Sequence, residues 1–343
     1  MIFKYDEWKA NLESKLQSDK NFSQLWNQFN NFETPEVELE WSSDEATRVV
    51  GGKILNQYGS SNKFIIGGSA DLAASTKQII SDNTFGSNNF GGNSIEFGIR
   101  EHAMGGIVNG LALHSNLIPY GSTFLVFSDY MRPSMRLASL MNINSLFIFT
   151  HDSIYLGEDG PTHQPIEHLM SLRLIPNLDV IRPSNSMELI HSYRYALEKR
   201  DNPKAIILSR QNMKFFDNDV SYADFQTGAY EFMPGSDITL IATGSELELA
   251  FEISTKLKDL SVQIISAPIL NRLNEERLES LSLNQNIFTI ELGRTIGWDT
   301  YIQNIKKSFS IDSFGESAPI DQLAEKFNFS AKKISDEIRS LLN

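Results

Sequence analysis

The chain has 343 residues, and its 30 Lys and Arg against 43 Asp and Glu give a formal charge of −13. This acidic balance argues against a general nucleic-acid or anionic-membrane binder, because phosphate backbones are held by clustered Lys and Arg. The absence of cysteine excludes disulfides, thiolate metal sites and cysteine nucleophiles. At about 150 residues per domain the length predicts two domains. Without a basic segment followed by an apolar run at its start, the protein is expected to be cytoplasmic.

The first 42 residues are more polar and amphipathic than the rest. Aromatic and leucine side chains recur every three or four residues in two runs, from Tyr5 to Leu16 and from Phe22 to Phe29. This spacing predicts two short helices that pack on a larger body. We interpret residues 1–42 as a helical connector.

From residue 43 onward, helical and strand-like segments alternate, which is typical of a parallel sheet with helices on both faces. This pattern assigns residues 43–220 to a first domain. Strands are expected at 64–66, 94–98, 145–151, 178–182 and 204–210, and helices at 43–58, 100–114, 124–141, 165–174 and 186–199.

A second alternation begins near Asp237 and predicts a domain over residues 229–343, after an irregular boundary at 215–228. Its strands read ITLIATG, VQIISAP and NIFTIEL, and its helices are expected to begin near Ser245, Glu275, Thr300 and Pro319. The predicted fold class is therefore α/β, with two doubly wound domains whose sheets are mainly parallel.

Three expected strands end in polar clusters, where doubly wound sheets bind ligands. The clusters are residues 67–71, His151 with residues 157–163, and residues 209–212. A turn rich in Gly and Asp is usually only a turn, but the recurrence at three strand ends favours a ligand site. The sequence contains no GxGxxG, GxxxxGK[ST], HExxH or GxSxG motif. His163, Glu167 and His168 lack zincin spacing, so no metal ligand is predicted.

Glu101 and a run of aromatic residues each have a structural explanation. Glu101 opens an expected helix, where a carboxylate interacts well with the helix dipole. Phe124, Phe127 and Tyr130 step by three and would cover one side of a helix as part of an aromatic core. From these residues alone, the structural explanations are favoured.

Longer segments are more specific than these patterns. They are GGSADL at 67–72, GIREH at 98–102, residues 119–125, THDS at 150–153, GEDGPTHQP at 157–165, SRQN at 209–212 and FGESAP at 314–319. Together they resemble the carboxyl-terminal half of transketolase, over essentially the whole chain from about residue 5.

The resemblance implies a ketol transferase of the pentose phosphate pathway. Such enzymes use thiamine diphosphate and a divalent cation, Mg²⁺ or Ca²⁺, to move a two-carbon ketol unit from a ketose phosphate to an aldose phosphate. Residues 43–220 would be the domain that binds the cofactor's aminopyrimidine, and residues 229–343 the dimer-forming C-terminal domain. Residues 1–42 match the connector that follows the first domain of full-length relatives.

The same resemblance assigns residues to the cofactor. Glu101 corresponds to the family's catalytic glutamate, which hydrogen-bonds N1′ of the pyrimidine. Phe127, with Phe124 and Tyr130 beside it, would form the apolar pocket that stacks the pyrimidine, and Asp71 would lie near the cofactor.

It also assigns residues to the substrate. His151 could in addition move protons during catalysis, because imidazole titrates near neutrality. Two guanidinium groups and a hydroxyl suit a phosphate dianion. The residues that match phosphate-holding groups are Arg48, Ser75 and Arg210, and those that match groups in contact with the sugar and its phosphate end are His151, Asp159 and His163.

The sequence has no Gly-Asp-Gly motif, which in the family holds the diphosphate and the metal on a separate domain. Asp159-Gly160 with Asn185 downstream imitates its spacing, but Glu158 stands where Gly is required. The chain thus carries half of the usual site and is expected to be inactive without an amino-terminal transketolase domain or subunit, in a homodimer or hetero-oligomer. A separately encoded subunit and a product truncated at an internal Met both fit.

Alternatives remain open. Dihydroxyacetone synthase shares much of the pattern, whereas deoxyxylulose-phosphate synthase and the 2-oxoacid dehydrogenase beta chain match it less well. A hypothesis of another class is a non-catalytic, transketolase-like fragment that acts as a dimerisation or regulatory partner.

Overall fold

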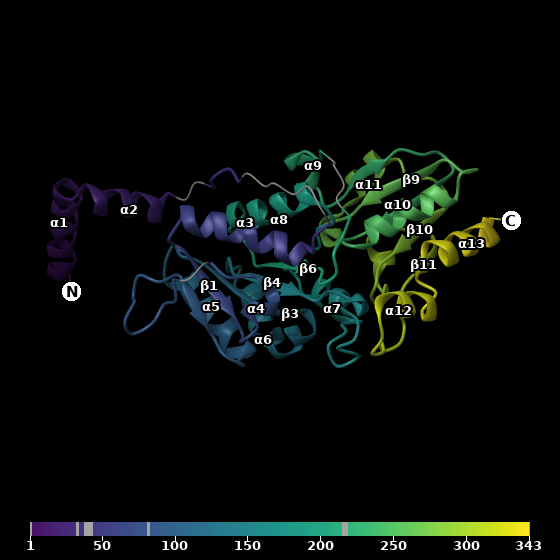
Figure 1. Cartoon of the computed structure of the whole chain (residues 1–343). Helices are drawn as coiled ribbons and strands as arrows, with labels where there is room; N and C mark the ends of the chain where they lie inside the picture. The colour runs from purple at the N-terminus through teal and green to yellow at the C-terminus, as the bar shows by residue number, and fades with distance from the viewer. Residues whose placement is uncertain (1, 32–33, 38–43, 81–82, 215–218, 343) are drawn as a thin grey trace.

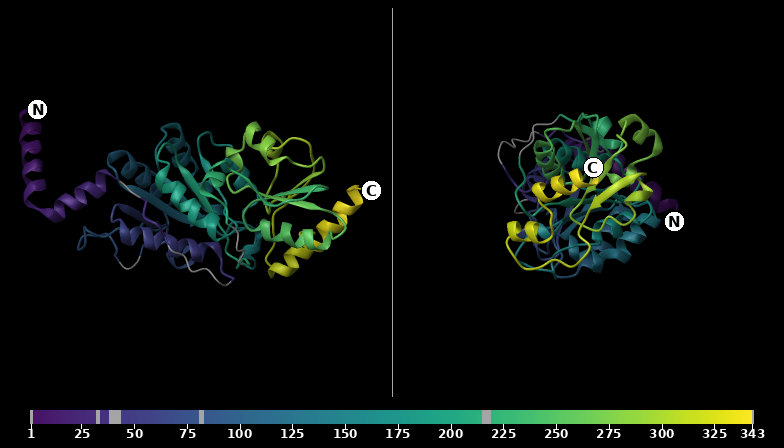
Figure 2. Two further views of the ribbon diagram at one scale, coloured as in Figure 1. Left: turned by 90° about the horizontal axis from the view of Figure 1, so that it is seen from above. Right: turned by 90° about the vertical axis from the view of Figure 1, so that its right-hand side faces the viewer.

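The computed structural model describes residues 2–31, 34–37, 44–80, 83–214 and 219–342. Two sheets lie one beyond the other along the molecule, and each is flanked by helices (Figure 1). The N-terminal helices extend from one end and the C-terminal helix lies at the other (Figure 2). The two α/β domains expected from the sequence are confirmed.

The first sheet is entirely parallel, with strand order β2-β1-β3-β4-β6-β5. Its central strands β3, β4 and β6 are buried along their whole length, as expected for a parallel sheet covered on both faces. The strands are β1 (Ile65–Ser69), β2 (Ser94–Glu96), β3 (Ile118–Phe124), β4 (Leu146–Thr150), β5 (Asp179–Ile181) and β6 (Lys204–Leu208).

Helices cover both faces of this sheet. Val50 and Ile54 of α3 join one hydrophobic core together with α8, and Met104 of α5 and Met131 of α6 belong to another. The helices are α3 (Thr47–Ser61), α4 (Ala73–Thr76), α5 (Glu101–His114), α6 (Ser128–Leu140), α7 (His168–Arg173) and α8 (Ser186–Glu198), with 3₁₀ turns η1 (Leu125–Phe127) and η2 (Ile154–Leu156).

The second sheet has the order β11-β10-β8-β9-β7, and only β7 is antiparallel to its neighbour. Its strands are β7 (Tyr230–Met233), β8 (Ile238–Ala242), β9 (Val262–Ser266), β10 (Ile287–Ile290) and β11 (Ile305–Phe309). The remaining helices are α9 (Tyr222–Gln226), α10 (Glu246–Lys256), η3 (Leu270–Arg272), α11 (Glu275–Leu281), η4 (Trp298–Thr300), α12 (Ile320–Lys326) and α13 (Ala331–Leu342).

Several expected element boundaries differ from the structure. The helix expected from residue 165 begins at His168. The helix expected from residue 124 begins at Ser128, because residues 118–124 form strand β3, which the sequence did not predict. The helix expected near Thr300 is only the turn η4, and strand β11 follows it. The helix expected from residue 43 begins at Thr47.

The two helices expected at the N-terminus are present as α1 (Ile2–Ser18) and α2 (Lys20–Asn30). Their predicted packing holds for α2, whose Phe29 ring lies 5.0 Å from that of Phe64. It fails for α1, which leaves Tyr5 and Trp8 more than half exposed at 59% and 51%. Parts of the expected connector and domain boundaries, residues 32–33, 38–43 and 215–218, lie outside the described residues, and the domain limits stay a prediction.

Within the described ranges, every helix is too short or too polar to cross a bilayer.

Candidate active site

Five of the residues singled out from the sequence lie at one edge of the first sheet. Asp71 follows β1, Glu101 follows β2, Phe124 ends β3, His151 follows β4 and Arg210 follows β6. Because these strands are all parallel, their carboxyl ends meet at this edge, where such sheets bind ligands.

Aromatic rings form a connected cluster there. The Phe124 ring stacks on the His151 imidazole with 3.7 Å between centroids, and it also neighbours Phe127 at 5.8 Å and His163 at 6.3 Å. Tyr130 continues the series at 5.9 Å from Phe127, and His163 meets Phe127 edge-on at 5.7 Å. The cluster runs from the buried His151 to Tyr130, which is 63% exposed. It therefore offers ring faces to a planar ligand.

The sequence predicted that these three rings would cover one side of a helix, and this prediction is wrong. Phe124 ends a strand, Phe127 lies in the turn η1 and Tyr130 lies in α6. The sharp change of direction between strand and helix brings the three rings together.

His151 is held in an unusual environment. Its backbone has a positive φ of 61°, and its Nδ1 lies 2.8 Å from the Thr150 hydroxyl oxygen. Burial, followed by the charges of Arg48 and Arg210, lowers the pKa of His151 to about 3. The expectation that this imidazole titrates near neutrality is therefore wrong for the chain by itself, and the ring is neutral at pH 7.

Two cations flank this imidazole. Arg48, on α3, donates a hydrogen bond to the carbonyl of Ser75, so the structure brings these two predicted residues together. Its Nε is buried without a hydrogen-bond partner among the described residues. Burial, and secondly repulsion from Arg210, lowers the pKa of Arg48. Arg210 itself is exposed, and two neighbouring guanidinium groups that repel each other favour an anion between them.

Within the described residues, no hydrogen bond or ion pair joins Asp71, Glu101 or Asp159 to the residues of the ring cluster. Asp71 lines a separate hollow of about 470 Å³ together with Gly68 and Arg100. Asp159 is exposed in the loop between Gly157 and Gly160.

Glu101 is the first residue of α5 and is only 8% exposed. Its carboxylate forms no hydrogen bond with any other residue in the described ranges. Its carboxylate oxygens are not among the fully buried polar atoms that lack a partner, so the small exposed part of this side chain leaves the carboxylate accessible to a ligand.

The structure adds residues that the sequence did not single out. Both polar atoms of the Gln211 amide are buried without a partner in the described part of the chain, and so are the hydroxyls of Ser122 and Thr123 on β3. Gln211 lies inside the polar cluster at 209–212, and its place at the end of an expected strand could have identified it as a candidate ligand-binding residue. Ser122 and Thr123 lie in the segment 119–125 that carries the resemblance, but neither hydroxyl was singled out, because β3 was not predicted.

Two sequence coincidences have structural explanations. Asn185 caps α8 by accepting a hydrogen bond from the Glu188 amide at 2.9 Å, so its spacing from Asp159 carries no ligand role. His163 packs in the ring cluster, apart from His168, whose Nε2 lies 3.2 Å from a carboxylate oxygen of Asp129.

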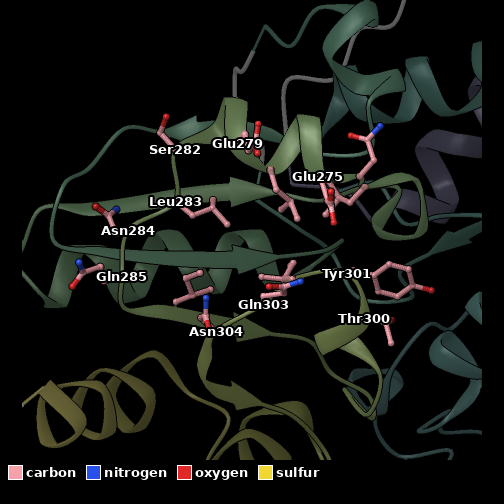
Figure 3. A pocket seen from close by; sticks show the side chains of 15 residues that line it. Glu275, Glu279, Ser282, Leu283, Asn284, Gln285, Thr300, Tyr301, Gln303 and Asn304 are labelled. Atoms are coloured by element: carbon pink, nitrogen blue, oxygen red, sulfur yellow. The ribbon is translucent and has the colours of Figure 1, made fainter.

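A cavity of about 850 Å³ lies in the second domain, far from this edge in the fold. Polar side chains such as Glu275, Asn284 and Gln303 line it together with Tyr301 (Figure 3). None of the site residues predicted from the sequence, all of which the structure describes, contributes to it.

A parallel sheet with ring faces, a mostly buried glutamate and two neighbouring arginines at its carboxyl edge is typical of a ligand-binding α/β domain. Comparison with known proteins makes this specific. Residues 44–215, half of the chain, match the family model of the transketolase pyrimidine-binding domain, and residues 228–330 match that of the transketolase-like C-terminal domain. The chain belongs to the transketolase family.

Individual relatives agree. The transketolase of Halalkalibacterium halodurans is 39% identical over 310 residues, which cover 87% of this chain and 46% of that protein. The structure of a Leishmania mexicana transketolase superimposes with a TM-score of 0.92 at 31% identity, over 98% of this chain and 52% of that one. The chain thus spans about half the length of these transketolases.

One further solved structure is matched over nearly its whole length, unlike the transketolases above. A chain of a split gene transketolase, described as an inactive β4 tetramer, superimposes with a TM-score of 0.72 over 87% of this chain and 98% of that one. At 24% identity this likeness shows the fold alone.

Proposed function

We propose that the chain is the carboxyl-terminal component of a transketolase, and that it transfers a two-carbon ketol group from a ketose phosphate to an aldose phosphate with thiamine diphosphate. The observation that carries this proposal is the ring cluster around Phe127, together with the two arginines, Arg48 and Arg210, whose charges act on His151. These groups lie at the carboxyl edge of the sheet, in the part of the chain that matches a transketolase pyrimidine-binding domain.

The site suits the pyrimidine end of the cofactor. Phe124, Phe127 and Tyr130 present ring faces of increasing exposure, which fits stacking on a flat heterocycle. The Glu101 side chain is mostly buried, and its carboxylate, which has no hydrogen bond in the described chain, is proposed to share a proton with a ring nitrogen. When bound, thiamine diphosphate supplies the nucleophilic carbon and the electron sink for breaking and forming the carbon–carbon bond. Asp71 is proposed to lie near the cofactor.

The substrate is proposed to bind across the cation pair. Arg48 and Arg210 hold its phosphate, with Ser75 fixing Arg48 through its carbonyl. The neutral His151 accepts a hydrogen bond from a sugar hydroxyl. An anion between the two arginines offsets their share of the lowering of the His151 pKa, whereas burial, the largest cause, continues to favour the neutral ring. His163 and the exposed Asp159 contact the remaining hydroxyls and the phosphate end.

The diphosphate and its Mg²⁺ or Ca²⁺ are proposed to be held by an amino-terminal transketolase domain, on a partner subunit or in a longer polypeptide. The two matched family models leave that domain unrepresented in these residues, which also contain no Gly-Asp-Gly motif. A split gene transketolase chain of the same fold is covered over 98% of its length, and we extend the two-chain arrangement that its name describes to this chain as part of the proposal. A dimeric or hetero-oligomeric assembly and a cytoplasmic location belong to the same proposal.

A ketol-transfer assay tests the proposal. The chain is mixed with a separately produced amino-terminal half of a bacterial transketolase, thiamine diphosphate, Mg²⁺, xylulose 5-phosphate and ribose 5-phosphate. Activity is expected in the mixture and not in either component. An inactive mixture in which the folded chain binds the added half would refute catalysis and favour the non-catalytic, regulatory or dimerising alternative.

A further inference from the structure

The two domains meet at the carboxyl ends of their strands, and Arg182 lies at that junction. Arg182 directly follows β5 of the first sheet. Its amide donates to the carbonyl of Pro268 at 2.8 Å, and its carbonyl accepts from the Gly244 amide at 3.0 Å. Both partners follow strands of the second sheet, β9 and β8.

The Arg182 guanidinium reaches in both directions from this junction. Toward the second domain, it donates to the Thr243 carbonyl at 2.9 Å and forms an ion pair with Glu246, at the first turn of α10. Toward the first domain, its Nε and Nη2 donate to one oxygen of Asp152 at 3.1 and 2.7 Å. All three charged side chains are almost completely buried.

The room for this side chain is built into the second domain. Gly244 has a positive φ of 53°, and a Cβ there would lie 2.6 Å from Arg182 Cγ. A larger residue at this position would therefore displace the guanidinium.

Asp152 depends on Arg182 alone. Within the described ranges its side chain makes no other hydrogen bond, and its second oxygen is buried without a partner. Asp152 is also the residue directly after His151, whose backbone lies in the left-handed region. A non-glycine residue stays in that region only where its surroundings hold it there. The residue before His151, Thr150, is fixed by its pairing with Leu208 in the first sheet. The residue after it, Asp152, is fixed by its hydrogen bonds from Arg182.

We propose that Arg182 is a positioning residue, through which Glu246 of the second domain holds Asp152 and so fixes the His151 imidazole against Phe124. The second domain thereby sets the geometry of the candidate site without touching its ligand. The effect of Arg182 on catalysis rests on the proposed function, whereas its effect on the position of the His151 ring concerns this chain alone.

The test measures the position of the His151 ring directly. In the full chain labelled at its six histidines, the His151 signals are assigned by their loss in His151→Asn. Stacking at 3.7 Å on Phe124 shifts the imidazole protons upfield. Glu246→Gln, nearly the same size but uncharged, is expected to abolish that upfield shift, because a neutral amide no longer anchors the guanidinium to the second domain, and Asp152, its remaining charged partner, is then free to move with it.

Arg272→Gln is the matched control. Arg272 also joins the two domains, through hydrogen bonds of 2.6 and 2.7 Å to Asp179, but it does not contact Asp152. It should leave the His151 signals in place. If Glu246→Gln does not fold, Arg182→Lys is measured in its place. Lysine keeps the positive charge but lacks the several N–H donors with which the guanidinium binds Asp152 and Glu246 together.

A folded Glu246→Gln chain with unchanged His151 signals would overturn the proposal, as would the same loss of shift in Arg272→Gln. Unfolding of both network variants would show that the network serves the fold alone. In the mixture active for ketol transfer, Glu246→Gln should lower kcat at least tenfold and leave the KM for the ketose phosphate within twofold, because the arginine pair that binds phosphate is unaltered. Since the ring signals need no activity, failure of the proposed function and failure of this inference are distinguishable.

Discussion

The ion pair between Arg173 and Glu291 gives a prediction of stability that can be worked from the contacts. Two guanidinium nitrogens of Arg173 donate to the two carboxylate oxygens of Glu291 at 2.8 and 2.7 Å. The two side chains are 1% and 0% exposed, and they join α7 of the first domain to the residue after β10. The Thr243 hydroxyl also donates to Glu291, at 2.9 Å.

Removing one partner of such a pair leaves the other charge buried. We therefore expect Glu291→Leu and Arg173→Met each to lower the free energy of unfolding by about 3–5 kcal/mol. The double variant should lose less than the two single changes added together, because it leaves no uncompensated charge.

Urea denaturation followed by tryptophan fluorescence measures these three differences. Single losses below about 1 kcal/mol, or a double variant whose loss is the sum of the single ones, would refute the reasoning. Lys214→Ala removes an exposed ion pair with Glu252 and serves as the control, for which a change below about 1 kcal/mol is expected.

Two further predictions concern pH and backbone space. Burial and the nearby arginines lower the pKa of His151 to about 3 in the folded chain, whereas its pKa in the unfolded chain is near 6.5. The unfolded chain therefore binds a proton at this residue more readily than the folded chain does. Stability should therefore fall as the pH drops below about 6.5, and His151→Asn should flatten this dependence in thermal scans; an unchanged slope would contradict it. A Cβ at Gly68 would overlap the Ile95 carbonyl of the paired strand, whereas one at Gly106 meets nothing within 4 Å. Gly68→Ala should thus cost about 3 kcal/mol or prevent folding, and Gly106→Ala should stabilise α5 by about 0.5–1 kcal/mol, so equal melting temperatures would contradict the packing argument.

The sequence predicted the parts of the fold that depend on local pattern. Strands β4, β6, β8 and β9 are short, mostly apolar runs bounded by turns, which is the pattern expected of strands in a sheet covered on both faces. Strand β3 was missed because Pro119 and Gly121 lower its strand propensity. The packing explains Gly121, since a Cβ there would lie 3.0 Å from Met104 of the covering helix α5.

The site was predictable as a location and less so as an arrangement. The rule that ligands bind at the carboxyl ends of parallel strands placed Asp71, His151 and Arg210 at one edge, and the resemblance suggested their roles. The lowered pKa of His151 was not predictable, because it depends on burial and on cations more than 50 residues away in sequence. The network of Arg182 could not be predicted for the same reason, since Asp152 follows β4 of the first domain and Glu246 begins α10 of the second.

The claim that this chain provides the pyrimidine-binding half of a ketol-transfer site depends most directly on Glu101. The decisive measurement is the rate of ketol transfer by the two-component mixture with Glu101→Gln, compared with Glu158→Gln at an exposed position of the same domain. Loss of the proton that Glu101 shares is expected to lower kcat by about 10²–10⁴-fold, while the chain still binds the added half and Glu158→Gln stays within twofold of the unchanged chain. A Glu101→Gln mixture as active as the unchanged one would contradict the assignment of this edge as the active site.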